Sequence, residues 1–160
     1  MLTPAIVFYD VVLTIHILAV VLAFGVVFTY PLLEARLRRT SPGDLAVLHR
    51  MQAFLTQRFI TPAMVVILVA GIYLAIARWS LGDPWISATF AILIVLFGLA
   101  GAVLGPLERR CAELAERDRR GGGGPSEEYA SEAGKLARFG GLALLLVVVA
   151  VFLMTAKPGV

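Results

Sequence analysis

Four long stretches without Asp, Glu, Lys or Arg constrain this chain more than any other feature of its sequence. They cover residues 11–33, 59–77, 84–107 and 139–156, and a charged residue flanks each one on both sides. A helix needs about 20 apolar residues to cross a hydrocarbon core roughly 30 Å thick. Backbone in lipid must also satisfy its own hydrogen bonds, which a helix does within one segment. The stretches therefore predict four transmembrane helices.

The composition supports this interpretation. Hydrophobic residues make up 59% of the 160 positions and charged residues 16%, with mean hydropathy +0.88, whereas soluble domains have about 45–50% and 25%. A soluble globule and a disordered chain are both excluded. We expect an all-α fold: a single integral-membrane domain, 1–160, forming a four-helix transmembrane bundle with up-down topology. The expected spans are about 9–33, 59–78, 85–107 and 138–157, with helices extended into the cytoplasm through connections 34–58 and 108–137.

The distribution of basic residues predicts the orientation of the bundle. Twelve of the 14 Lys and Arg residues lie in the two long connections, and only Arg78 and Lys157 lie on the other side. Because basic connections stay in the cytoplasm, both termini are expected outside the cell inner (plasma) membrane, N-out and C-out. This bias also explains the net charge of +3, so the sequence indicates a lipid bilayer and no nucleic acid as partner.

Local signals divide the connections into helices. Ser41 followed by Pro42 predicts a capped helix start, and a kink is expected near Thr61–Pro62. Residues 108–120 are expected to be helical and to end at the four glycines 121–124. Ser126 is then expected to cap the last helix.

Charge spacing adds an expectation for the helix at 108–120. Glu113 with Arg117, and Glu116 with Arg120, have the i, i+4 spacing that favours ion pairs on a helix.

His16 is the only ionisable side chain well inside a span. An ionisable group within the membrane is a functional hypothesis by default, because its burial must be offset by a partner. One interpretation makes His16 a metal ligand, specifically an axial ligand of haem b held between helices. The other makes it a neutral side chain that hydrogen-bonds a neighbouring helix. The residues leave both open.

A second haem ligand is less clear from the sequence. Met154 is expected near the same membrane surface as His16, although methionines in membrane helices more often pack than ligate. A five-coordinate haem, or one shared in a homo-oligomer, would need no second ligand. His49 is expected on the solvated face of a basic helix, and Cys111 is the single cysteine.

Other chemistry is missing from the spans. No charged residue lies inside them, which disfavours a proton-coupled transporter, and no catalytic motif indicates an enzyme. Small residues at four-residue spacing predict helix contacts, within the bundle or between copies. These are Ala19 with Ala23, Gly71 with Ala75, and Gly101 with Gly105.

Several short motifs resemble a family of small predicted integral-membrane proteins, known only as a domain of unknown function. They are Ile15–Val20, Tyr30–Leu32, Thr61–Pro62, Gly71–Ala75 and Phe152–Pro158. The resemblance covers nearly the whole chain and implies four spans without implying an activity.

A first-span histidine followed by a second span that contains proline also resembles, more distantly, the copper-resistance protein D and J-type protoporphyrinogen oxidase superfamily. That resemblance implies a haem role for His16. Leu13 and Thr14 stand where a lysine is expected, and Leu32 where an arginine is expected, so oxidase activity is not predicted.

Two functions follow from the sequence. The first is a haem-binding or redox-associated membrane protein that uses His16 and a redox partner. The alternative is a non-catalytic structural or partner subunit. A small oligomeric channel or exporter is a weaker third, because no span carries a polar stripe.

Overall fold

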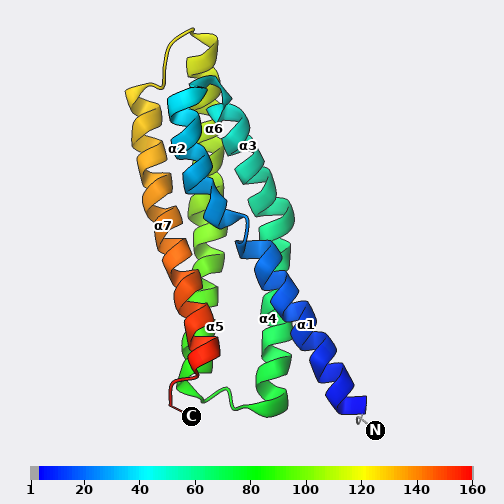
Figure 1. The fold of residues 1–160 in the computed structure, drawn as a ribbon. Coiled ribbons are helices and arrows are strands. Elements are labelled where there is room, and N and C mark those ends of the chain that lie inside the picture. Colours follow the sequence, from blue (N-terminus) through cyan, green and yellow to red (C-terminus); the bar gives the residue numbers. More distant parts are fainter. Residues whose placement is uncertain (1–3, 160) are drawn as a thin grey trace.

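The computed structural model describes residues 4–159, which are helical with short turns and contain no strand. The elements form four long rods: α1 with α2, α3 with α4, α5 with α6, and α7 alone (Figure 1). In chain order the elements are α1 Pro4–Phe24, η1 Val27–Thr29, α2 Tyr30–Thr40, η2 Pro42–Asp44, α3 Leu45–Leu55, η3 Thr56–Ile60, α4 Thr61–Arg78, α5 Pro84–Gly98, η4 Leu99–Leu104, α6 Gly105–Arg120 and α7 Glu127–Ala156.

The rods run up and down, which confirms the expected all-α bundle. The start of α1 and the end of α7 lie with the α4–α5 turn at one end of the bundle, here called the terminal end (Figure 1). The α2–α3 and α6–α7 turns lie at the opposite end, here called the basic end. Four helical segments of 30 to 37 residues are long and apolar enough to cross a membrane. At 1.5 Å per residue they reach about 45–55 Å, more than a hydrocarbon core requires.

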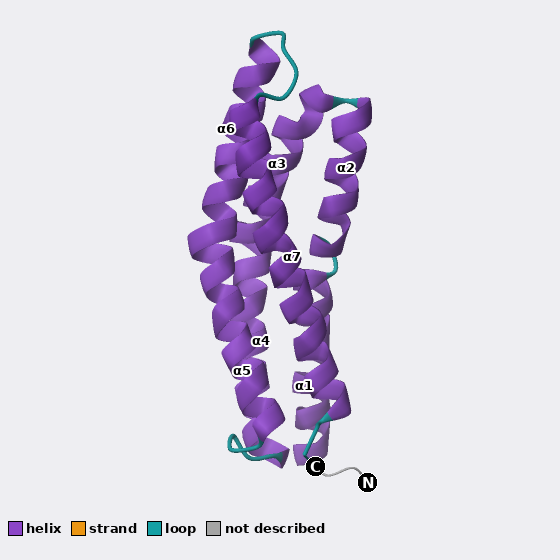
Figure 2. Ribbon diagram, turned by 90° about the vertical axis from the view of Figure 1, so that its left-hand side faces the viewer, coloured by secondary structure: helices purple, strands orange, loops and turns teal. Residues whose placement is uncertain are grey.

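The first rod is broken halfway, where the sequence predicts one continuous span over 9–33. α1 ends at Phe24, and α2 begins only at Tyr30 (Figures 1 and 2). The Gly25 N–H still bonds the Val21 carbonyl at 2.8 Å, but a Cβ on Gly25 would lie 2.6 Å from that oxygen. Pro31, which has no N–H, then sits in the first turn of α2. A run of apolar residues indicates how long a span is, but it does not show whether the helix is continuous. Because the residues at this break are themselves apolar, the run alone predicted one unbroken helix.

The second and third rods each contain a π-helical segment. Thr56–Ile60 ends directly before Thr61 and Pro62, where the sequence predicts a kink. The rod changes there from π-helix to α-helix and does not end. The Thr61 hydroxyl donates to the Thr56 carbonyl five residues back, at 2.8 Å. Leu99–Leu104 forms the second such segment. π-Segments within helices are frequent at functional sites, and both of these border the same cavity, described below.

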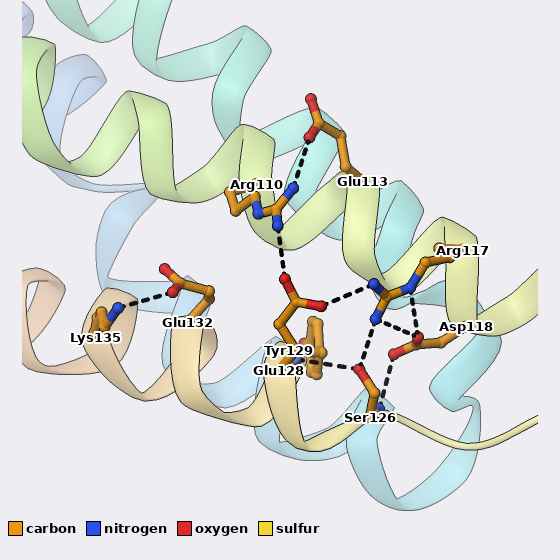
Figure 3. A network of polar contacts seen from close by, with 9 residues as sticks. All are labelled: Arg110, Glu113, Arg117, Asp118, Ser126, Glu128, Tyr129, Glu132 and Lys135. Atoms are coloured by element: carbon orange, nitrogen blue, oxygen red, sulfur yellow. Dashed lines mark hydrogen bonds and ion pairs between the residues drawn. The ribbon is translucent and has the colours of Figure 1, made fainter.

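The α6–α7 turn is fastened by a polar network at the basic end (Figure 3). Ser126 caps α7 as expected, because its hydroxyl accepts from the Tyr129 N–H at 3.2 Å. Asp118 accepts from the Ser126 N–H at 2.8 Å, and Arg117 pairs with Glu128 at 2.8 Å. These contacts hold the two helices together across the glycine run.

Two local expectations in the connections are wrong in detail. Glu113 pairs with Arg110 at 3.7 Å and not with Arg117, whose guanidinium reaches across to α7. Ser41 does precede a helical turn, but its side chain makes no capping hydrogen bond. The expected Glu116–Arg120 pair is present at 2.9 Å.

Helix packing places the core in two main layers. α1 packs against α4, α3 against α6, and α5 against α7. The middle layer is built from Ala19, Ala23, Ile60, Met64, Ile67, Leu93, Leu96, Ala100, Ala143 and Val147. The basic-end layer is built from Leu45, Ala46, Cys111, Leu114, Ala115, Tyr129, Ala133 and Leu136. Many apolar side chains on the outer face of the bundle remain exposed, as lipid contact requires.

Candidate functional site

Two cavities that share no lining residue lie one above the other inside the bundle. The terminal-end cavity, of about 240 Å³, is lined by His16, Thr89, Met154 and Lys157 together with apolar and aromatic side chains. The basic-end cavity, of about 110 Å³, is lined by Tyr30, Glu34, Gln52, Thr56 and Glu108 within a largely apolar wall. Each cavity therefore combines apolar walls with a few polar groups, as small-molecule sites do.

His16 faces the terminal-end cavity from α1. Its side chain is only 6% exposed. The imidazole lies over Gly71 of α4, where an added Cβ would be 3.4 Å from His16 Cε1. The Ile67 backbone approaches the ring, yet His16 Nδ1 is buried without a partner of hydrogen-bonding geometry. An unpartnered buried nitrogen is unusual and calls for an explanation.

Met154 lines the same cavity from α7. The sequence placed it near the same membrane surface as His16, and the structure brings the two to one cavity. Whether its sulfur ligates a metal stays a prediction. Trp85 also lines this cavity, and its indole Nε1 is a second buried nitrogen without a partner.

Aromatic and cationic side chains surround the mouth of the terminal-end cavity. Trp79 and Trp85 stack edge to face at 5.4 Å between ring centroids. The Lys157 ammonium lies 4.5 Å from the Trp79 ring centroid, and the Arg78 guanidinium lies 4.0 Å from the Tyr9 ring centroid. The terminal end therefore offers two cations beside an apolar cavity.

His49 is not on a solvated face, so that expectation is wrong. The side chain is 0% exposed, with Nδ1 2.7 Å from Gln52 Oε1 and Nε2 2.8 Å from the Tyr129 hydroxyl. Burial lowers the pKa of His49. Tyr129 is 80 residues away on α7, so no local pattern could have indicated this contact. His49 lines neither cavity.

The polar members of the basic-end cavity were missed by sequence reasoning. Glu108 was read only as the charge that ends the third span, and Tyr30 as part of the end of the first. In the structure both line the basic-end cavity, Tyr30 from α2 and Glu108 from α6. Figure 2 shows α2 and α1 as separate segments of the first rod. Within the described residues, no group of three or more His, Cys, Asp or Glu side chains could hold a metal ion.

The structure supports the helix contacts predicted for small residues in the first and second spans, but among the described residues it shows none for the pair in the third span. Ala19 and Ala23 are buried between helices, and Gly71 supports His16, as expected for helix contacts. An added Cβ on Gly101 would meet no atom within 4 Å, and one on Gly105 only the Ala100 carbonyl of its own rod. An added side chain at either glycine would therefore meet no other helix within the described residues, although Gly105 itself is buried.

Comparison with known proteins places the chain in a family. The family model described as "Predicted integral membrane protein (DUF2269)" matches residues 10–158. The chain belongs to this family. The match agrees with the four membrane-crossing helices, and the family description assigns no activity. No curated protein and no solved structure matches the chain.

Proposed function

We propose that this member of the family is a haem-binding membrane protein with His16 as an axial ligand. One observation carries the proposal: the buried His16 imidazole lines the terminal-end cavity. Neutral imidazole is a common haem ligand. Iron in this cavity would bind a ring nitrogen of His16.

The surrounding residues suit such a group in chemistry, whereas the cavity encloses only part of it. Met154 lines the cavity and is the candidate sixth ligand. Lys157 and Arg78 provide cations for the propionate groups at the terminal end. The cavity, at about 240 Å³, falls below the range of about 300–1,000 Å³ usual for ligand sites. One chain would therefore enclose only part of a porphyrin, and a second copy would cover the rest.

Haem would give the protein one-electron chemistry, and hence a redox partner. The positive charge at the basic end supports a cytoplasmic position for that end, with the haem site near the outer surface of the cell inner membrane. The resemblance to the copper-resistance protein D superfamily rests on the first-span histidine and adds nothing independent to this argument.

The alternative function is a structural or partner subunit without a cofactor. The contact between the His16 ring and Gly71 favours it, because it joins α1 to α4 at close range. In that case His16 would be a buried hydrogen-bonding residue, with the Ile67 backbone of α4 as its partner. Its loss would weaken the bundle without any spectral consequence.

Difference spectra of the full chain in detergent micelles, with hemin added, test the proposal. The wild type is expected to show a Soret band and a reduced α band, and His16→Gly is expected to lose both. Added imidazole should restore the bands in His16→Gly, since free imidazole can occupy the space of the missing ring. Met154→Leu should keep haem but alter the reduced spectrum.

The control is His49→Gln, which changes the other histidine and leaves the terminal-end cavity intact. A wild type that stays colourless with hemin would overturn the proposal. So would a spectrum that His16→Gly leaves unchanged. Circular dichroism and gel filtration would show whether each variant retains the fold.

A further inference from the structure

The basic-end cavity holds two polar atoms that the fold leaves without partners. It lies where the first rod is broken, between Tyr30 of α2, Thr56 of η3 and Glu108 of α6, with α7 opposite. Glu108 Oε2 and the Tyr30 hydroxyl oxygen are both buried and make no hydrogen bond. An unpartnered buried polar atom is unfavourable, so two at one cavity point to a site for a hydrogen-bonding ligand.

The other polar members of this cavity have their partners. Glu34 accepts from Arg38 Nη2 at 2.6 Å, so its charge is balanced. Gln52 Oε1 is 2.7 Å from a ring nitrogen of His49. The unpartnered atoms are therefore confined to the Glu108 and Tyr30 side of the cavity.

Glu108 has no cation in direct contact among the described residues, and the charge of Arg109 acts on it only from a longer distance. Its side chain is only 4% exposed, and among the described residues it forms no ion pair within 4.0 Å. One oxygen accepts from the Thr56 hydroxyl at 3.1 Å, and the other has nothing. A buried carboxylate requires a positive partner or a proton.

We propose that the basic-end cavity binds a primary ammonium group, with Glu108 as its counter-ion. An ammonium has three donors and no acceptor, which suits Glu108 Oε2 and the Tyr30 oxygen. A divalent metal is disfavoured, because calcium takes six to eight oxygen ligands and magnesium six, whereas this cavity is lined mainly by carbon.

The size of the cavity limits the ligand. A water molecule takes about 30 Å³ in the liquid, so about 110 Å³ holds roughly four non-hydrogen atoms. That accommodates the ammonium and the first carbons of its chain. Gly140 and Gly141 of α7 line the same cavity, and an added Cβ on either would meet no atom within 4 Å. The α7 side thus has room for further carbons.

A primary ammonium group can come from two sources, a free alkylamine and the headgroup of phosphatidylethanolamine. Both present the same ammonium group to Glu108. The cavity selects that group, and the two sources differ only in what is attached beyond the first carbons.

Titration calorimetry with three probes of one chain length tests the inference. The full chain in detergent micelles is titrated with n-butylammonium, n-butanol and butyrate. We expect at least tenfold tighter binding of butylammonium than of butanol, and no binding of butyrate. Glu108→Gln should abolish the preference for the amine. Glu113→Gln, on the same helix but 70% exposed at its side chain, should keep it.

Two further arms complete the test. Tyr30→Phe removes one acceptor and should weaken butylammonium binding severalfold even if Glu108→Gln fails to fold. In nanodiscs, competition by phosphatidylethanolamine but not phosphatidylcholine would identify the lipid headgroup as the ligand, and its absence a free amine. Equal binding of amine and alcohol by the wild type, or an amine preference retained in folded Glu108→Gln, would overturn the inference.

Discussion

At the scale of single residues, the bond between His49 and Tyr129 joins α3 to α7 inside the basic-end layer. Both side chains are 0% exposed, and the Tyr129 hydroxyl lies 2.8 Å from His49 Nε2. Tyr129→Phe would remove the hydroxyl and leave that nitrogen buried without a partner. We expect a loss of about 1–3 kcal/mol in the free energy of unfolding, measured by chemical unfolding in mixed micelles.

The matched control is Tyr73→Phe. Tyr73 is 36% exposed and stacks edge to face on Phe8, a contact that phenylalanine retains. The loss of the hydroxyl in Tyr73→Phe should change the free energy of unfolding by less than about 0.5 kcal/mol, as substitutions at exposed positions usually do. Equal effects of the two variants would show that the His49 contact contributes nothing to the fold.

At the scale of elements, the break between α1 and α2 depends on Gly25. Gly25→Ala would place a methyl carbon 2.6 Å from the Val21 carbonyl oxygen, which is backbone and can move only with the helix. We expect this variant to unfold more easily and to change the basic-end cavity, which Phe24 and Val27 line on either side of the glycine. Unfolding in mixed micelles measures the first effect.

Gly134→Ala is the control for this substitution. Gly134 lies inside α7, and an added Cβ there would meet no atom within 4 Å. Alanine is a better helix former than glycine by about 1 kcal/mol, so Gly134→Ala should be neutral or stabilising. Destabilisation of the same size in both variants would mean that the close approach at Gly25 is not its cause.

The α6–α7 turn should respond to acid through Asp118. The hydrogen bond from the Ser126 N–H, with the Arg117 charge beside it, lowers the pKa of Asp118. A carboxyl with a lowered folded pKa stabilises the folded state above its unfolded pKa, about 4, and loses that contribution as pH falls further. At pH 7 Asp118→Asn should therefore be less stable than the wild type, by under about 1 kcal/mol.

The difference in stability between the wild type and Asp118→Asn should shrink as pH falls from about 5 to 3. Thermal unfolding of both at a series of pH values provides the measurement. A stability difference that stays constant over this range would show that the charge of Asp118 has no part in holding the turn.

Sequence patterns predicted the elements better than the contacts between them. Charge-free runs are enough to locate four helices, and Ser126 caps α7 because its cap depends on neighbours in the chain. The break after Phe24 lies inside an unbroken apolar run. Gly25 and Pro31 are its only local marks there, and both residue types are common in membrane helices. The burial of His49 and Glu108 depends on partners in other rods, at Tyr129 and Thr56. Local patterns could indicate that these residues are polar, but not that they face inward.

At the scale of the whole molecule, the two cavities are stacked along the bundle and separated by packed side chains. Leu93 lines the terminal-end cavity, and Leu96, one turn further along α5, lines the basic-end cavity. Both leucines belong to the buried middle layer. The two cavities share no lining residue, which favours two separate binding sites over a channel within a single chain.

The orientation of the bundle decides which cavity meets which side of the membrane. Basic residues gather at the basic end, so we expect that end in the cytoplasm. In a Cys111→Ala background, a membrane-impermeant maleimide applied to intact cells should label Gly82→Cys, in the terminal-end turn, and spare Gly123→Cys, in the basic-end turn, until the cells are opened. The reverse pattern would place the His16 cavity on the cytoplasmic side. Any redox partner would then have to approach from within the cell, and the ammonium site would lie toward the outer leaflet.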